Sequence, residues 1–312
     1  MKKSLLLFLV VALVLTVASA VCAEEFYIGY SCNNFNDTFQ TVIKDYAQAY
    51  AEANDIKFYL ADAQNDEMKQ QDQIRGMIED GVNALVVVAV NPQGVDAIVD
   101  LAKEAGIPLV FVNRNPYSDE GAVIPEGVYY VGSNEIDAGK FQAQFVVDKL
   151  GEDAECGYVV LLGELSNTAT PLRTQGNKEV FDALPGYKFL AEQTGNWQRD
   201  QGLSITENYI TTYGDELCAV MSNNDEMALG AVEALEVAGI KDKVVVVGVD
   251  LIDDAITAIE AGRLDASVKQ DGKGQGEGAM GVALAVLKGE EVEQNTVVPF
   301  VPVSLDNLEE YK

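Results

Sequence analysis

The most constraining feature of this sequence is an alternation of short apolar, β-branched runs with longer segments whose apolar residues recur at helical spacing. In the first part of the chain, this pattern predicts strands at 26–32, 56–60, 84–88, 109–112 and 128–131. Helices are expected between them at 38–53, 66–79 and 95–105. Repeated strand–helix–strand units of this length favour a parallel sheet with helices on both faces.

The same pattern then begins again. Strands are predicted at 158–162, 188–191, 217–221, 244–249 and 266–268, with helices at 136–150, 171–183, 201–212, 225–238 and 253–261. A final helix at about 274–287 and late strands near 297–303 complete the chain. No linker rich in proline, glycine or serine separates the halves, so we expect α/β architecture with two doubly wound parallel-sheet lobes joined as a hinged pair.

The N-terminus has the three parts of a secretory signal. Lys2 and Lys3 precede an apolar run at 5–17, and small residues lead to a cleavage site before Glu24. The predicted signal peptide is therefore 1–23. A membrane anchor is the alternative, but the apolar run is shorter than the roughly 20 residues that a span needs. Lipidation at Cys22 ranks second, because Val21 is a poor residue before a lipidated cysteine.

Charge and composition exclude several classes of function. The formal net charge is −29, from 21 basic and 50 acidic side chains, and such an excess repels nucleic acid and anionic lipid. The chain has no histidine, which removes the commonest general base, the commonest transition-metal ligand and any Ser-His-Asp triad. The glycine-rich segment 272–278 lacks the spacer of a phosphate loop, so close packing beside a cleft is the better interpretation. We therefore expect a protein that is not an enzyme, with no cofactor, no bound metal and no nucleic-acid partner.

Three cysteines, Cys32, Cys156 and Cys218, remain after signal removal, and an odd number cannot pair off completely within one chain. All three lie in or beside apolar runs, where cysteine commonly behaves as a small buried hydrophobe. We favour three free thiols, and a Cys156–Cys218 bridge is the alternative.

Polar and aromatic residues recur directly after the predicted strands of both lobes. Ligands of open parallel sheets bind beyond the carboxyl ends of the strands. Amides, carboxylates and arginine suit a neutral polyol, which needs donors and acceptors together, and aromatic rings stack on its C–H faces. A helix-capping role is the competing interpretation for Asn36, Asn223 and Asp225. The predicted ligand-binding residues are Asp37, Phe39, Asn113, Arg114, Asn167, Arg173, Trp197, Asn224, Asp250 and Gln270.

Several segments together carry a family resemblance. Asp-Ala-Gln-Asn-Asp at 62–66, Ile-Pro-Leu-Val-Phe-Val-Asn-Arg at 107–114, Asn-Asn-Asp-Glu-Met-Ala-Leu-Gly-Ala at 223–231 and Val-Gly-Val-Asp at 247–250 resemble periplasmic solute-binding proteins of the ribose/galactose class. The nearest likeness is to glucose/galactose-binding proteins. That likeness implies polar contacts to a sugar from Asp37, Asn113, Arg173, Asn224, Asp250 and the position of Gln270, and stacking on Phe39 and Trp197.

The sequence departs from that pattern at a few positions. Asn167 replaces a histidine of the family, Ala169 removes an aspartate, and Gln270 stands where the glucose/galactose binders carry asparagine. Gln270 and Arg114 are instead similar to ribose binders. The segment 151–157 is too short for the acidic calcium loop of the enteric galactose binders, so no structural calcium is expected.

The resemblance implies a type I periplasmic-binding-protein fold, with lobes at 24–132 plus 271–299 and at 133–270 plus 300–312. Hinge positions are expected at Ser133, Asp271 and Phe300. The implied function is capture of a monosaccharide, glucose or galactose, by a monomeric periplasmic protein for the permease of an ABC transporter, with a chemoreceptor as a further candidate partner. A ribose or other pentose binder, and a receptor for a sugar or autoinducer signal, are the alternatives.

Overall fold

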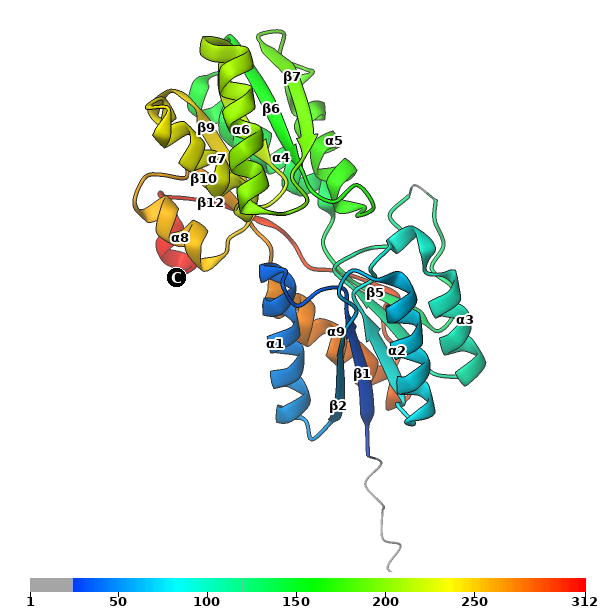
Figure 1. The fold of residues 1–312 in the computed structure, drawn as a ribbon. Coiled ribbons are helices and arrows are strands. Elements are labelled where there is room, and N and C mark those ends of the chain that lie inside the picture. The colour runs from blue at the N-terminus through cyan, green and yellow to red at the C-terminus, as the bar shows by residue number, and fades with distance from the viewer. Residues whose placement is uncertain (1–24, 120) are drawn as a thin grey trace, which may run out of the picture.

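The structure of the chain is a computed structural model that describes residues 25–119 and 121–312. The predicted signal peptide, with its alternative lipidation site at Cys22, lies outside the described residues. The described part forms two α/β lobes, one above the other in Figure 1. Each lobe has one sheet of six strands, as the repeated strand–helix pattern predicts.

The sheet of the first lobe has the order β11-β5-β4-β3-β1-β2, and its paired strands are all parallel. Alternate residues of β1, such as Ile28 and Tyr30, face the core shared with α1 and α9, whereas Leu85 and Val87 of β3 face the core under α2 and α3. The strands are β1 (Tyr27–Cys32), β2 (Lys57–Asp62), β3 (Ala84–Val87), β4 (Leu109–Val112), β5 (Val128–Gly132) and β11 (Asn295–Val297). The helices are α1 (Thr38–Ala53), α2 (Glu67–Glu79), α3 (Asp96–Ala105) and α9 (Gly272–Leu287), with a 3-10 turn at η1 (Pro92–Gly94).

The sheet of the second lobe has the order β12-β10-β9-β8-β6-β7, parallel except for β12, which runs antiparallel to β10. Buried side chains of α6 and α7 cover one face of this sheet, and those of α4 and α5 cover the other. The strands are β6 (Cys156–Leu162), β7 (Tyr187–Thr194), β8 (Leu217–Ser222), β9 (Val245–Asp250), β10 (Ala266–Lys269) and β12 (Val301–Ser304). The helices are α4 (Glu135–Leu150), α5 (Ala169–Phe181), α6 (Arg199–Tyr213), α7 (Asp225–Val237) and α8 (Asp253–Glu260), with 3-10 turns at η2 (Gly214–Glu216), η3 (Lys241–Lys243) and η4 (Leu308–Glu310).

The chain passes from one sheet to the other after β5, after β10 and between β11 and β12. Ser133 lies in the first of these segments, Asp271 in the second and Phe300 in the third. The hinge prediction therefore concerns residues that sit where the chain crosses between lobes.

The glycine-rich start of α9 lets this helix approach α1 closely. A Cβ atom at Gly276 would lie 2.4 Å from the carbonyl oxygen of Ile43 in α1, so a larger residue there would push the two helices apart. This contact fits the interpretation of segment 272–278 as a packing element beside the cleft.

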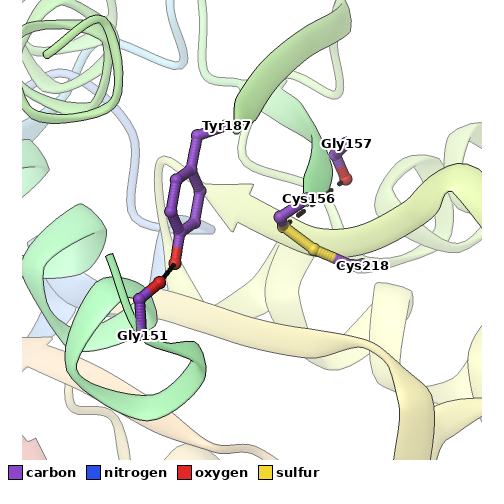
Figure 2. The surroundings of a disulfide bond; sticks show 5 residues. All are labelled: Gly151, Cys156, Gly157, Tyr187 and Cys218. Atoms are coloured by element: carbon purple, nitrogen blue, oxygen red, sulfur yellow. Dashed lines mark hydrogen bonds between the residues drawn. A yellow bond between two sulfur atoms is a disulfide. The ribbon is translucent and has the colours of Figure 1, made fainter. Parts of the chain in front are cut away.

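The preferred prediction of three free thiols was wrong, and its alternative, a Cys156–Cys218 bridge, is present. Cys156 of β6 and Cys218 of β8 form a disulfide with a Cα–Cα distance of 5.4 Å (Figure 2). The two strands are neighbours in the sheet, with Gly157 paired to Leu217, so the cysteines are diagonal neighbours. Among the described residues, Cys32 is the cysteine without a disulfide partner, and it is buried in β1. At the same end of the second lobe, the Tyr187 hydroxyl donates to the carbonyl of Gly151 at 2.7 Å.

Within residues 25–119 and 121–312, no helix has the length and apolar character needed to cross a membrane. The same described ranges contain no cluster of three or more histidine, cysteine, aspartate or glutamate side chains arranged to hold a metal ion.

Candidate ligand-binding site

A polar cavity lies between the two lobes, at the carboxyl ends of their strands. The first lobe contributes Asp37, Phe39, Gln40 and Asn113, and the second contributes Asn167, Ala169, Arg173, Trp197, Asn224, Asp250 and Gln270. Nine of the ten residues predicted from the sequence line this cavity. It continues into a wider cleft that shares Asp37, Phe39, Trp197, Asn224 and Asp250 and is open to solvent.

Three cavity residues have left-handed backbone conformations. The φ angles are 66° at Asn113, 65° at Trp197 and 120° at Asp250. Such conformations are uncommon for residues other than glycine, and they gather where a surrounding structure holds a side chain in a required position. Here Asp250 ends β9, Asn113 directly follows β4, and Trp197 lies in the turn between β7 and α6, so the backbone turns away while the side chain reaches the cavity.

Arg173 of α5 is the centre of a buried charge network. Its Nε donates to Glu135 at 2.7 Å, one Nη donates to the carbonyl of Asn223 at 2.6 Å, and the other donates to Oε1 of Gln270 at 3.3 Å. Arg173 and Glu135 are each 4% exposed. Burial acts to lower the pKa of Arg173, but the carboxylates of Glu135, Asp250 and Asp225 together outweigh it and the pKa is raised, so the guanidinium stays charged. The network thus fixes a charged donor at the wall of the cavity.

Two carboxylates face the cavity from opposite lobes. Asp37 caps α1, where its Oδ1 accepts from the backbone N–H groups of Phe39 at 3.0 Å and Gln40 at 3.1 Å. Asp250 is 7% exposed, and its Oδ1 lies 3.9 Å from an Nη atom of Arg173. Burial raises the pKa of both carboxyls, against the opposing effects of Arg114 on Asp37 and of Arg173 on Asp250. Both groups therefore gain from hydroxyl donors supplied by a ligand.

Two aromatic rings border the cavity, Phe39 from the first lobe and Trp197 from the second. The indole of Trp197 lies directly on the backbone at Gly163, where a Cβ atom would come 1.9 Å from the ring carbon Cη2. The guanidinium carbon of Arg173 is 5.9 Å from the centre of the indole. These contacts hold the ring in one orientation, which suits stacking on the apolar face of a sugar.

The asparagines at the strand ends combine capping with a place at the cavity. Asn224 caps α7 by accepting from the N–H of Met227 at 3.1 Å, and its Nδ2 donates to the carbonyl of Trp197 at 3.2 Å. The Oδ1 atom of Asn167 accepts from the N–H of Ala169 at 3.0 Å, and the Nδ2 donors of Asn167 take no part in that bond. Asn223 and Asp225 do not line the cavity. Both are fully buried, and their side chains accept from backbone N–H groups of Gly163 and Ile252.

Arg114 is the predicted residue that the structure places beside the cavity and not in its lining. Its guanidinium donates to Oε2 of Glu164 at 3.1 Å and to the carbonyl of Val90 at 3.1 Å. The other carboxylate oxygen of Glu164 accepts from Asn65 at 3.2 Å. Because Glu164 belongs to the second lobe, these bonds join the two lobes at the edge of the cleft.

Gln40 is the polar cavity residue that is absent from the sequence prediction. It lies three positions after Asp37 in the first turn of α1, so both side chains share one face of the helix. That spacing is the signal in the sequence that points to Gln40, because this residue does not directly follow a strand.

A two-lobed α/β architecture with a polar cavity between the lobes defines a class of solute-binding proteins. The model of the periplasmic binding protein domain family matches residues 28–291, and this chain belongs to that family. A protein of Rhizobium meliloti to which rhizopine binding is assigned is 41% identical over 306 residues, covering 97% of each chain. The ribose import binding protein of Haemophilus influenzae is 32% identical, covering 99% of this chain and 100% of the relative.

Among solved structures, an ABC transporter solute-binding protein of Bacillus halodurans with bound myo-inositol is similar, with a TM-score of 0.85 and 35% identity. The match covers 92% of this chain and 97% of that one. The D-galactose-binding periplasmic protein of Haemophilus influenzae is 28% identical. The predicted fold and the solute-binding family are thus confirmed, whereas a particular nearness to galactose binders has only this weaker match.

Proposed function

We propose that this protein captures a monosaccharide, or a ring polyol of similar size, in the cavity between its lobes and delivers it to the membrane permease of an ABC transporter. The observation that carries the proposal is the lining itself. Two aromatic faces, two carboxylates, a fixed arginine and several amides converge from both lobes on one small cavity. Neutral polyols need this mixture of donors, acceptors and apolar ring faces.

Two kinds of observation bear on the identity of the solute, and they favour different compounds. The residue pattern at Asp37, Phe39, Trp197 and Asp250 resembles glucose/galactose binders, whereas relatives that are more similar along the whole chain bear the names of ribose and rhizopine binders. The structural relative with bound myo-inositol adds a cyclitol to the candidates. Glucose and galactose therefore stand beside ribose and myo-inositol as the ligands to test.

Ligand capture would be coupled to closure of the lobes. Only a closed arrangement lets Asp37 and Asn113 of one lobe, and Arg173 and Asp250 of the other, bond the same solute. A ligand that makes these bonds in the closed form alone shifts the population toward that form. The transporter would then recognise the closed, ligand-bound form of the protein.

Export to the periplasm belongs to this proposal. The Cys156–Cys218 disulfide supports it, because disulfides persist in oxidising compartments such as the bacterial periplasm.

Calorimetric titration tests the proposal. The protein would be titrated with D-glucose, D-galactose, D-ribose and myo-inositol, with L-lysine as an unrelated solute. We expect saturable heat with a 1:1 stoichiometry for at least one of the four polyols and none for lysine. The absence of binding to all four would contradict the proposal.

A further inference from the structure

Gln40 has one half of its side-chain amide bonded and the other half open. Its Nε2 donates to Oδ1 of Asn113 at 2.7 Å. Gln40 is only 4% exposed and lines the cavity. Its Oε1 is buried and has no hydrogen-bond partner among the described residues. A buried acceptor without a partner is costly, and such a group in a native structure needs an explanation.

A series of buried amides lies behind this side chain and shares its hydrogen bonds. Asn113 uses its Oδ1 for Gln40 and donates its Nδ2 to Oε1 of Gln275 at 3.1 Å. Gln275 is fully buried and in turn donates to the hydroxyl of Ser133 at 3.2 Å. Each amide in the series donates in the same direction, toward Ser133. With Asn113 in this orientation, exchanging the two ends of the Gln40 amide would set its carbonyl oxygen against the Asn113 oxygen, so the carbonyl end of Gln40 is the one left free.

Asp37 supplies a second acceptor on the same helix face. One of its oxygens is engaged by the backbone N–H groups of Phe39 and Gln40, whereas no hydrogen bond within the described residues engages Oδ2. Residues three apart on a helix are neighbours. The first lobe therefore presents two adjacent acceptors to the cavity, the carboxylate of Asp37 and the carbonyl of Gln40.

We infer that Gln40 is a specificity-determining residue, whose Oε1 accepts a hydrogen bond from a ligand hydroxyl beside the one that Asp37 accepts. This inference rests on the proposed function and narrows it. The ligand carries hydroxyl groups on two adjacent ring carbons at the edge that faces α1. A monodeoxy analogue that lacks the hydroxyl at Gln40 leaves a buried acceptor unpaired, so the site discriminates against it.

The test uses the member of the panel of D-glucose, D-galactose, D-ribose and myo-inositol that binds most tightly, and the monodeoxy analogues of that compound. Wild-type protein is expected to bind one analogue about 5- to 150-fold more weakly because of the Gln40 contact. In Gln40→Met, which keeps the length of the side chain without its amide, the parent compound and that analogue should bind equally.

Gln70→Met is the matched control. It also removes buried side-chain hydrogen bonds in the first lobe, to the hydroxyl of Ser31 and the carbonyl of Val88, but Gln70 belongs neither to the amide series nor to the cavity lining. A purely structural effect would therefore change both variants alike, whereas we expect Gln70→Met to keep the full preference for the parent over the deoxy analogue. Thermal melting of each variant reports its folding separately from binding.

Two results would overturn the inference. One is a Gln40→Met variant that discriminates against the same analogue as strongly as wild type does. The other needs no variant: every monodeoxy analogue binds wild-type protein within about twofold of the parent. If none of the four polyols binds wild type at all, the proposed function fails at an earlier step, so the two failures are distinguishable.

Discussion

The two lobes hold their cavity residues in different ways. The second lobe builds its wall around a buried ion pair, Arg173 with Glu135, whose hydrogen bonds are largely satisfied within the lobe. The first lobe uses neutral amides, Gln40, Asn113 and Gln275, and leaves the Oε1 acceptor of Gln40 open. At the cavity the second lobe leaves two donors without a partner among the described residues, Nε2 of Gln270 and Nε1 of Trp197. The second lobe thus differs from the first by its fixed charged platform, and both lobes leave hydrogen bonds for the ligand to complete.

The two lobes also differ in the state of their cysteines. The second lobe has the Cys156–Cys218 disulfide between adjacent strands, whereas Cys32 in the first lobe is a buried free thiol. Burial raises the pKa of Cys32 to about 12, so its thiol stays protonated and unreactive at neutral pH.

The largest expected effect comes from breaking the charged platform. Arg173→Met leaves Glu135 buried without its partner, so we expect the free energy of unfolding to fall by about 3–5 kcal/mol and ligand binding to be lost. Urea unfolding and calorimetry measure the two effects. Arg263→Met, which breaks an exposed pair with Glu236, is the control and should cost about 1 kcal/mol or less.

A second variant sharpens this first prediction. Arg173→Met combined with Glu135→Leu removes both charges, so most of the stability should return while binding stays absent. If Arg173→Met were as stable as Arg263→Met, the second lobe would not have the charged platform that distinguishes it from the first.

The next largest effect concerns the disulfide. Replacing Cys156 and Cys218 by serine should lower the free energy of unfolding by about 2–4 kcal/mol, because the cross-link restricts the unfolded chain. Ligand affinity should change little, since neither cysteine lines the cavity. Adding a reductant to wild type should reproduce the loss and should leave the serine variant unchanged. Equal stability of wild type and variant would contradict this account.

A smaller effect is expected from each stacking ring. Trp197→Leu and Phe39→Leu should each weaken binding by about 1–2 kcal/mol, or roughly 5- to 30-fold, through loss of aromatic contact with the sugar. Phe189→Leu changes a half-exposed ring of the second lobe outside the cavity and serves as control. A loss confined to Trp197→Leu would show that stacking comes from the second lobe alone.

The mildest effect is a dependence of affinity on pH. Ligand hydroxyls donate to ionised carboxylates, and burial raises the pKa of Asp37 and, to a greater degree, of Asp250. Affinity should therefore be full above these raised pKa values and fall as the pH decreases through them. Calorimetry between about pH 5 and pH 8 measures the trend. In Asp250→Asn the decline should be smaller, and an unchanged decline would assign it to the first lobe.

Most of the fold could be predicted from the sequence, because the alternation of strand and helix patterns is local. The rule that parallel strands present their carboxyl ends at one edge selected Asn113, Trp197 and Asp250 from the sequence, and all three line the cavity. The disulfide could not be predicted in this way, because β6 and β8 are not consecutive in the chain and become neighbours only through the crossover order of the sheet.

The contacts between the lobes also could not be predicted from the sequence. Arg114 pairs with Glu164, which lies 50 positions away in the other lobe, and no local sequence pattern predicts such a pair. Gln40 was missed for a related reason, since its place at the cavity and its hydrogen bond to Asn113, 73 positions away, are tertiary contacts.

The most direct test of the central claim is a crystal structure of the protein with the tightest-binding polyol of the panel. We expect one molecule between Phe39 and Trp197, with hydrogen bonds to Asp37 and Gln40 from one lobe and to Arg173 and Asp250 from the other. A polyol bound outside this cavity, or held by residues of a single lobe, would contradict the claim that the two lobes share one ligand site.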